Sequence, residues 1–180
     1  VFNGPVRTES ALERAVAERS IINVDSMRDL AVCVDAANRL RSRARLVLRC
    51  NFEVADGRPS RFGVDADGPE FAVIVEQLSA IDEIDFLGLH CHFPNRDLAS
   101  FERRIDRMLA LVDDVFGARA PEILNLGGGY LSTLPAELRE TMGLEQVRHA
   151  DYARVIAGAF RRRFPDDGNR PRLILEPGTT

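Results

Sequence analysis

The stretch that decides the fold is residues 122–130, Glu-Ile-Leu-Asn-Leu-Gly-Gly-Gly-Tyr, in which a short apolar strand leads directly into three consecutive glycines. Glycines without a Cβ let backbone N–H groups turn towards an anion, which favours a phosphate-binding loop. A flexible turn is the alternative that this motif alone leaves open. Other short apolar runs have the same strand-like character; they are residues 21–24, 45–50, 84–90 and 172–176, with Val1-Phe2 as the end of a further one.

Between these runs, apolar residues recur three and four positions apart, which is the period of a helix packed on one face. The pattern predicts helices around residues 12–16, 27–40, 71–78, 98–115 and 152–160. Ser10 and Glu13 have the spacing of a capping box, and Ser26 is placed as an N-cap. Strands that are apolar along their whole length and alternate with helices predict an α/β protein with a covered parallel sheet.

Two architectures fit this alternation, a doubly wound open sheet and a (β/α)₈ TIM-type barrel. Nearly every predicted strand ends in residues capable of chemistry: Asn3-Gly4, Asp25-Ser26, Arg49-Cys50-Asn51, His90-Cys91-His92, Gly127-Gly128-Gly129 and Glu176. A barrel draws its site from the ends of many strands, whereas an open sheet concentrates it at one switch point. We therefore predict an incomplete (β/α)₈ barrel, with residues 1–180 forming one domain of about six of the eight βα units and the two missing units preceding Val1.

The composition excludes several functions. All 24 basic residues are arginine, so the chain itself offers no Schiff-base lysine and no P-loop lysine. With a formal net charge of -4 and acidic residues interleaved with the arginines, nucleic acid is not the expected partner. No apolar stretch has the length of a membrane span. Cys33, Cys50 and Cys91 lack metal-ligand spacing and suit reduced thiols in a cytoplasmic protein.

The histidine pair and the last strand carry the remaining chemistry. His90 and His92 are two residues apart at a strand end, so both rings point to one side. No Asp or Glu falls at a matching strand end with cysteine spacing to help, and we predict no metal site. Glu176 ends an apolar strand, where a carboxylate needs a cation or strong donors. The protonated nitrogen of a pyridoxal ring is one such partner, and a structural ion pair with an arginine is the other.

Taken in order, Gly88-Leu89-His90-Cys91-His92, the loop at 124–130 and Leu175-Glu176-Pro177-Gly178 resemble the barrel domain of the fold-type III pyridoxal phosphate decarboxylases, which act on diaminopimelate, ornithine, arginine and related amino acids. Arg61-Phe62-Gly63, Asn3-Gly4-Pro5 and residues 23–26 resemble further elements of that family, so the likeness covers the whole chain.

The resemblance implies a role for each matching residue. His92 would stack on the cofactor ring, Glu176 would bind its nitrogen, and Arg49 would lie near its oxygen side. The phosphate would be held by Gly127, Gly128 and Gly129, with Tyr130, Asn95, Gly178 and Thr179 around them. The family's lysine lies on the first barrel strand and its C-terminal β-domain follows the Glu-Pro-Gly strand, so this chain alone should be inactive. Family members complete their active site as homodimers.

Two departures from the family pattern concern the phosphate. Where the family usually has Ile/Val-Gly-Ser after the histidine, this chain has Phe93-Pro94-Asn95, and where an arginine usually follows Glu-Pro-Gly it has Thr179. Neutral donors and the glycine loop should therefore carry more of the binding. Arg96 is a candidate to meet a carboxylate of the substrate, which would suit a bulky acidic amino acid of the kind processed in siderophore or other natural-product pathways.

Three alternatives remain. An alanine-racemase-like enzyme has the same barrel and a similar glycine loop but places an arginine at the ring nitrogen, so Glu176 favours decarboxylation. A cofactor-free regulatory homologue would keep the barrel and bind a partner protein. A metal-dependent barrel hydrolase would use His90 and His92.

Overall fold

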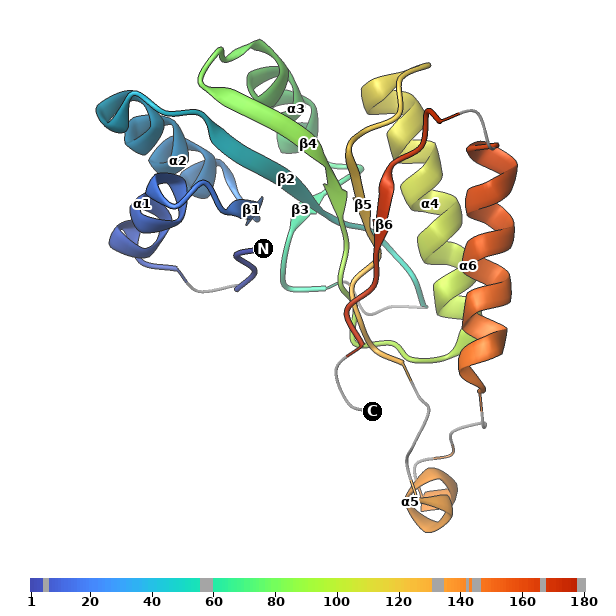
Figure 1. The fold of residues 1–180 in the computed structure, drawn as a ribbon. Helices are drawn as coiled ribbons and strands as arrows, with labels where there is room; N and C mark the ends of the chain where they lie inside the picture. Colours follow the sequence, from blue (N-terminus) through green and yellow to red (C-terminus); the bar gives the residue numbers. More distant parts are fainter. Residues whose placement is uncertain are drawn as a thin grey trace.

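The computed structural model describes residues 1–4, 7–55, 60–130, 135–141, 143, 147–165 and 168–177. Five strands form one parallel sheet whose spatial order follows the chain, namely β1 (Ile21–Val24), β2 (Ala44–Asn51), β4 (Ile84–His90), β5 (Ile123–Asn125) and β6 (Arg172–Ile174) (Figure 1). Phe2 adds a parallel bridge to Ile22 on the far side of β1. These are the six expected strand positions in their expected order.

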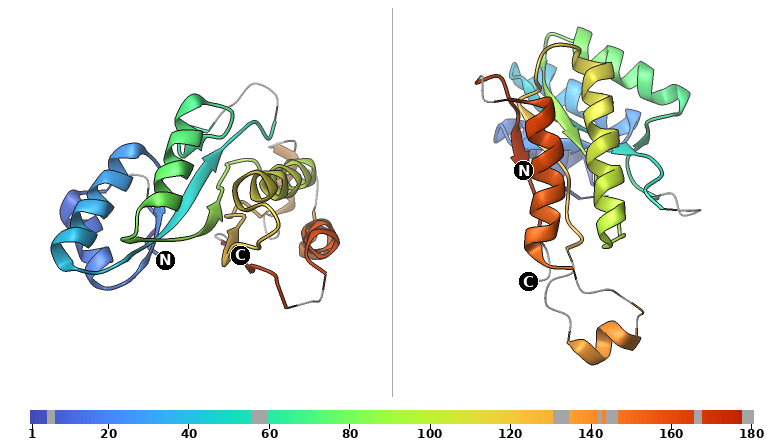
Figure 2. Two further views of the ribbon diagram at one scale, coloured as in Figure 1. Left: turned by 90° about the horizontal axis from the view of Figure 1, so that it is seen from above. Right: turned by 90° about the vertical axis from the view of Figure 1, so that its right-hand side faces the viewer.

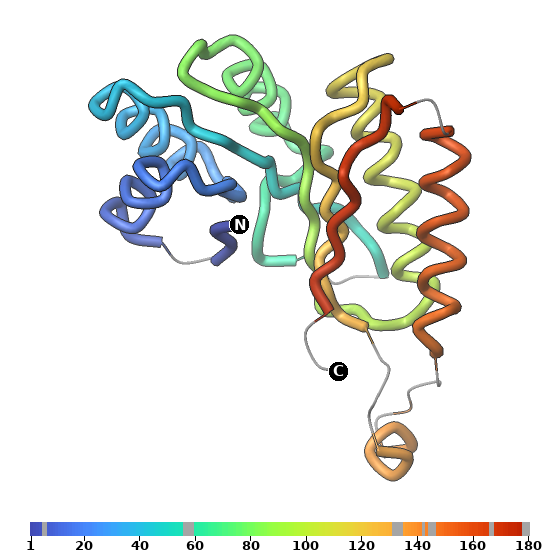
Figure 3. The backbone as a smooth tube through the Cα atoms, viewed as in Figure 1, coloured from blue at the N-terminus to red at the C-terminus, as the bar shows by residue number. Residues whose placement is uncertain are grey.

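The strand order separates the two candidate architectures. A doubly wound sheet reverses its order at a switch point, whereas this sheet never does. Right-handed crossovers taken always in one direction place all the connecting helices on one face. Figure 2 shows this arrangement, and Figure 3 lets the chain be followed through it: the strands lie along an arc with helices on its outer side, as in part of a barrel. The helices are α1 (Glu9–Ala17), α2 (Met27–Leu40), α3 (Pro69–Ala80), α4 (Leu98–Phe116), α5 (Ala136–Thr141) and α6 (His149–Arg163).

Three details differ from the sequence-based expectation. The capping box at Ser10 and Glu13 is wrong, because the helix begins earlier and Thr8 is its N-cap, accepting a hydrogen bond from the Ala11 amide. Ser26 caps α2 as predicted. The two-residue strand β3 (Val64–Asp65), paired with the end of β2, and the short helix α5 were not predicted. Neither element is long enough to show a period, and α5 buries no residue.

The two faces of the sheet bury two separate apolar clusters. Leu46, Leu48, Leu89 and Leu124 pack outwards against the helices in the main core. Val47 and Ile123 alternate with the outward residues of their strands and form a small inner cluster with Leu87, flanked by Ile21 and Ile174; Leu87 lies at a register irregularity between β2 and β4. Because successive side chains of a strand point to opposite faces, the inner cluster fills the concave side of the arc.

The described helices include none that is long and apolar enough to cross a membrane. All three cysteines are buried and free. Burial raises the pKa of the Cys33 and Cys91 thiols to about 12, so both are protonated near neutral pH.

Candidate active site

A layer of polar side chains lies directly beyond the inner apolar cluster, towards the carboxyl ends of the strands. Asn23, Arg49 and Asn125 each follow an inner apolar residue by two positions, and Glu176 follows Ile174 in the same way. The two-residue period of a strand therefore turns all four to the concave face. Asn23, Arg49 and Asn125 are at most 5% exposed, and groups this deeply buried need partners.

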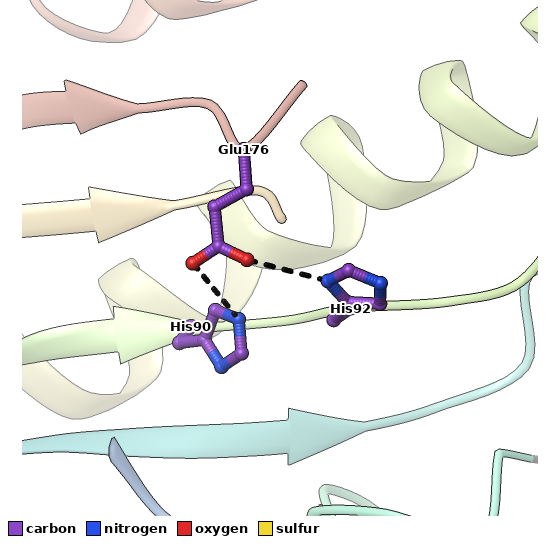
Figure 4. A group of neighbouring side chains, drawn as sticks. All are labelled: His90, His92 and Glu176. Carbon is purple, nitrogen blue, oxygen red and sulfur yellow. Dashed lines mark hydrogen bonds and ion pairs between the residues drawn. The ribbon is translucent and has the colours of Figure 1, made fainter. Parts of the chain in front are cut away.

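Glu176 is the acceptor on which several of these side chains converge. Asn125 Nδ2 donates to Oε1 at 2.8 Å, and Asn3 Nδ2 lies 3.1 Å and 3.2 Å from the two oxygens. His92 Nδ1 lies 3.3 Å from Oε2 (Figure 4). The hydrogen bonds from His92 and Asn125 lower the pKa of Glu176 to about 2 against the opposing effect of burial, so the carboxylate is ionised near neutral pH.

The predicted alternative partner of Glu176, an arginine, is not found. Among the residues that the structure describes, no arginine lies within ion-pair distance of this carboxylate. Its negative charge is met by amides and imidazoles, which leaves it available to a cationic group entering from the mouth of the arc.

The two histidines stand in different environments. His90 is fully buried, and burial lowers its pKa to about 3, so the ring is neutral near neutral pH although its Nε2 lies 3.8 Å from Glu176 Oε1. His92 keeps 42% of its side chain exposed. Its Nδ1 is also 3.4 Å from the Gly128 amide. Since Nδ1 either donates to Glu176 or accepts from Gly128, the tautomer of the His92 ring selects one of the two contacts.

The sequence-based argument against a metal is wrong in one respect. It held that no carboxylate accompanies the histidine pair, but Glu176 arrives from a different strand, and ligand atoms of His90, His92 and Glu176 all lie within 4.8 Å of one another (Figure 4). Two imidazoles and a carboxylate are ligands that zinc takes in proteins, and among the described residues this trio is the group that could hold a metal ion.

The glycine loop is packed closely against two other strand ends. A Cβ on Gly127, whose φ is +66°, would lie 2.3 Å from the carbonyl oxygen of Cys91, and one on Gly128 would lie 2.2 Å from that of Glu176. Side chains at these positions would push the strand ends apart. In the described part of the chain no group accepts a hydrogen bond from the backbone N–H of Gly129 or Tyr130. The loop therefore offers unpaired donors beside Glu176, as an anion-binding loop does.

A cavity of about 480 Å³ opens next to these groups. It is lined by Asn3, Arg49, Ser60, Arg61, Phe62, His92 and Pro94. Arg49 is held there by Asp25, whose Oδ2 lies 3.1 Å from Nη1, and by the ring of Phe62, 5.2 Å from its guanidinium carbon. Asp25 is itself bound by Arg7 at 2.8 Å. Burial raises the pKa of Asp25, while Arg49 and Arg7 act in the opposite direction.

The remaining predicted site residues are placed as follows. The ring of Tyr130 packs between Phe101 and Tyr152, so only its backbone faces the loop. The carbonyl of Asn95 is bound by Arg104. The side chain of Arg96 is exposed and does not line the cavity, so its role towards substrate stays a prediction. Gly178 and Thr179 lie outside the described residues.

Sequence reasoning missed three contributors. The apolar pattern places Asn125 inside a strand without marking it as a site residue, although a buried amide between two leucines is itself a signal. Asn3 was noted only through its motif, and its contact with Glu176 spans 173 positions. Arg104 lies within an apolar helical stripe and gave no local signal.

A parallel barrel whose strand ends present an ionised carboxylate, an exposed imidazole and a glycine loop has the architecture of a pyridoxal phosphate enzyme of the barrel type. The sequence matches the family described as pyridoxal-dependent decarboxylase, pyridoxal binding domain, over residues 1–180, and the chain belongs to that family.

Individual relatives agree with this assignment. The chain is 28% identical over 142 residues to a diaminopimelate decarboxylase of Aquifex aeolicus (strain VF5), covering 72% of this chain and 33% of the relative. It is 23% identical over 192 residues to the Bacillus subtilis (strain 168) diaminopimelate decarboxylase, covering 98% and 42%. The crystal structure of the diaminopimelate decarboxylase of M. jannaschii superposes with a TM-score of 0.81 at 23% identity, covering 98% of this chain and 42% of that one. The chain thus spans between a third and about two fifths of the length of its curated relatives.

Proposed function

We propose that the protein to which this chain contributes is a pyridoxal phosphate-dependent amino-acid decarboxylase, and that residues 1–180 are its cofactor-binding barrel. The observation that carries the proposal is Glu176, an ionised carboxylate at the centre of the strand ends that no described arginine neutralises. The family membership and the diaminopimelate decarboxylases among the relatives support it.

The residues present fit the cofactor. Glu176 would bind the ring nitrogen and keep it protonated, since a carboxylate whose pKa is lowered retains its charge. His92, with its ring partly exposed beside Glu176, would cover one face of the cofactor ring. The amides of Gly129 and Tyr130, which have no acceptor among the described residues, would receive the phosphate at the glycine loop Gly127–Gly129. Arg49, fixed by Asp25 at the cavity wall, would face the oxygen side of the ring.

When bound, pyridoxal phosphate supplies an electron sink for the pair left at the substrate α-carbon after a bond to it breaks. The chain's own contribution is electrostatic and positional. Glu176 would stabilise positive charge at the ring nitrogen, and the buried neutral His90 would provide an uncharged wall beside it. Asn3 and Asn125 hold the carboxylate oxygens at fixed positions, so that little reorganisation is needed during the reaction.

Glu176 also favours decarboxylation over racemisation. A racemase of this barrel type resembles the chain in its glycine loop but uses an arginine at the ring nitrogen, which cannot keep that nitrogen protonated. No described arginine contacts the position that the nitrogen would take beside Glu176. A protonated ring nitrogen lets the cofactor ring accept the electron pair that is left when CO₂ leaves the substrate.

The lysine that bonds to the cofactor must come from outside residues 1–180, because all 24 basic residues of the chain are arginine. The relatives are more than twice as long as the matched region, which leaves room for that lysine and for a second domain. We therefore propose that the chain is inactive by itself and that the full-length protein acts as a homodimer in the cytoplasm.

Diaminopimelate is the first substrate to test, since it is the one named for the curated relatives. Arg49 and Arg61 line the cavity, and the exposed Arg96 follows the cavity residue Pro94 by two positions. Because these side chains are cationic, acidic amino acids should be tested as substrates as well. If Arg96 contacts substrate, the Arg96→Ala variant should raise the KM for an acidic substrate, and an unchanged KM would exclude that role.

The experiment is to incubate the full-length protein and pyridoxal phosphate with diaminopimelate, ornithine, arginine, lysine and an acidic amino acid. CO₂ release and product chirality are measured together. We expect CO₂ release on one of them, and for Glu176→Gln a kcat lower by about 10²-fold, the size of losing one preorganised electrostatic contact. The exposed Glu122 gives the matched control, Glu122→Gln, with unchanged kcat. Racemisation without CO₂ would establish the racemase alternative, and failure to bind the cofactor would favour the regulatory one.

A further inference from the structure

Arg104 is a charged residue in the middle of the apolar face of α4. Phe101, Ile105 and Met108 flank it on that face, and its side chain is fully buried with 0% exposure. Arginine is rarely buried to this extent without a specific set of partners. Burial lowers its pKa, yet a guanidinium remains protonated near neutral pH, so the core holds a full positive charge at this point.

The guanidinium of Arg104 connects two loops of the candidate site. Nη1 donates to the carbonyl of Gly128 at 2.8 Å, in the loop that follows β5. Nη2 donates to the carbonyls of Phe93 at 3.4 Å and Asn95, in the loop that follows β4 and carries His92. The planar fork thus fixes the two loops relative to each other, because one rigid group carries donors to both.

Among the described residues, no carboxylate forms an ion pair with Arg104. The other two buried arginines of the described chain, Arg7 and Arg49, each form an ion pair with Asp25. Arg104 has no ion pair with any residue that the structure describes; besides the carbonyls it contacts the ring of Phe101, 4.0 Å from its guanidinium carbon. Its Nε is also buried without a partner. An unneutralised buried charge is costly, and an anion close by offsets that cost.

The contact with Gly128 also orients the loop. In a planar trans peptide the C=O and the following N–H point in opposite directions. Because Arg104 draws the Gly128 carbonyl towards α4, the N–H of Gly129 points away from α4. That N–H donates to no group among the described residues, and a Cβ on Gly129 would lie 3.7 Å from Arg104 Nη2. This donor, unpaired among the described residues, therefore points away from α4, with the positive charge of Arg104 on its α4 side.

We propose that Arg104 is the positioning residue of the phosphate loop and the fixed positive charge beneath it, so that it determines affinity for the cofactor's phosphate group in particular. The inference rests on the proposed function, because it assigns the anion at this loop to the phosphate of pyridoxal phosphate. This chain has Asn95 where the resembled family usually has serine, and Thr179 where it usually has arginine. Arg104 would supply the positive charge for the phosphate dianion that those two residues do not.

The test compares pyridoxal phosphate with pyridoxal, which lacks the phosphate, on the full-length protein. Dissociation constants are measured by absorbance for wild type, Arg104→Met and Arg104→Lys. The control is Arg103→Met, an exposed arginine one position away that donates to the carbonyl of Val54. We expect Arg104→Met to weaken binding of pyridoxal phosphate by about tenfold or more, as expected for loss of one charge-assisted contact.

The same variant should change pyridoxal binding by less than about threefold, and Arg104→Lys, which keeps the charge, should retain most of the preference for the phosphorylated form. Arg103→Met should match wild type for both ligands. An Arg104→Met protein that is merely less stable but keeps the preference overturns the proposal. If that variant does not fold, Arg104→Gln takes its place with the same expectation.

A second measurement uses inorganic phosphate alone and does not depend on the decarboxylase assignment. Phosphate should raise the thermal midpoint of wild type and of Arg103→Met but not that of the neutral Arg104 variants. In wild type it should slow hydrogen exchange at residues 93–96 and 127–130 together. Protection confined to other segments overturns the role of Arg104. The protein could bind phosphate in an Arg104-dependent way and yet release no CO₂ from any substrate. That result would support the role of Arg104 and contradict the proposed decarboxylase function.

Discussion

The side-chain amide of Asn125 joins two parts of the site: its Nδ2 lies 2.8 Å from Oε1 of Glu176, and its Oδ1 accepts the Gly127 amide at 2.9 Å. One residue at the end of β5 therefore holds both the carboxylate that follows β6 and the first glycine of the loop. The carboxylate and the glycine loop are positioned by a shared group and should respond together when it is changed.

Replacing Asn125 by alanine should loosen both contacts. We expect the free energy of unfolding to fall by about 2 kcal/mol, because a buried hydrogen bond to a charged group is lost and the Gly127 amide is left unpaired. Urea unfolding measures the change. Asn38→Ala is the control, since Asn38 is exposed and its side chain donates to the Val34 carbonyl one turn earlier in the same helix. Equal effects of the two substitutions would contradict the role given to Asn125.

Glu176 should make the protein sensitive to acid in a defined range. Its pKa is lowered from an ordinary value of 4.5 to about 2, so the unfolded chain takes up the proton first. The stability that Glu176 contributes is complete above pH 4.5 and is lost as the pH falls towards 2. The difference in unfolding midpoint between wild type and Glu176→Gln should therefore shrink over this range. A difference that stays constant with pH would show that the carboxylate is not stabilised in the fold.

The buried His90 should make stability depend on pH in a second, higher pH range. Burial lowers its pKa from 6.5 to about 3, so below pH 6.5 the unfolded state binds a proton that the folded state does not. Stability should decrease as the pH falls from 6.5 towards 3, with a slope approaching about 1.4 kcal/mol per pH unit. His90→Phe should remove this slope, while His149→Phe at the exposed start of α6 should keep it. Denaturant unfolding at a series of pH values distinguishes the two variants.

Gly128 should not tolerate a side chain. Alanine there places a Cβ 2.2 Å from the Glu176 carbonyl oxygen, so we expect a loss of about 2 kcal/mol or more from overpacking. Gly158 lies within α6, where the nearest atom to a new Cβ is 3.6 Å away. Gly158→Ala should instead stabilise the protein by about 0.5–1 kcal/mol through helix propensity. Thermal unfolding of both variants gives the comparison. If Gly128→Ala left the stability unchanged, the strand ends would not be packed as described.

The isolated chain of 180 residues should form no borohydride-stable adduct with pyridoxal phosphate on a lysine, since it contains none. Peptide mass spectrometry after reduction is the measurement, with the full-length protein as the positive control. An adduct on a side chain within residues 1–180 would require a different mode of cofactor attachment from the one proposed.

Much of the fold was accessible from local pattern. The strands at 21–24 and 84–90 have the predicted bounds, and α2 and α4 cover the predicted apolar stripes. The strands β5 and β6 are shorter than predicted, although backbone hydrogen bonds from Leu126 to Ile174 and from Glu176 to Gly127 still join the two segments beyond the strand ends. The helix α5, which buries nothing, carries no pattern that sequence reasoning could detect.

By itself the sequence determined the alternation of strands and helices, the polar residue at each strand end, and the absence of lysine, because these depend on residue identity and on periods of two and 3.6. Only the tertiary structure decided which of those strand ends meet. Asn3 reaches Glu176 across 173 positions, and Arg104 reaches the Gly128 carbonyl from a helix face that looked wholly apolar. Such contacts follow from the order and curvature of the sheet, which brings distant strand ends to one mouth and which no local periodicity encodes.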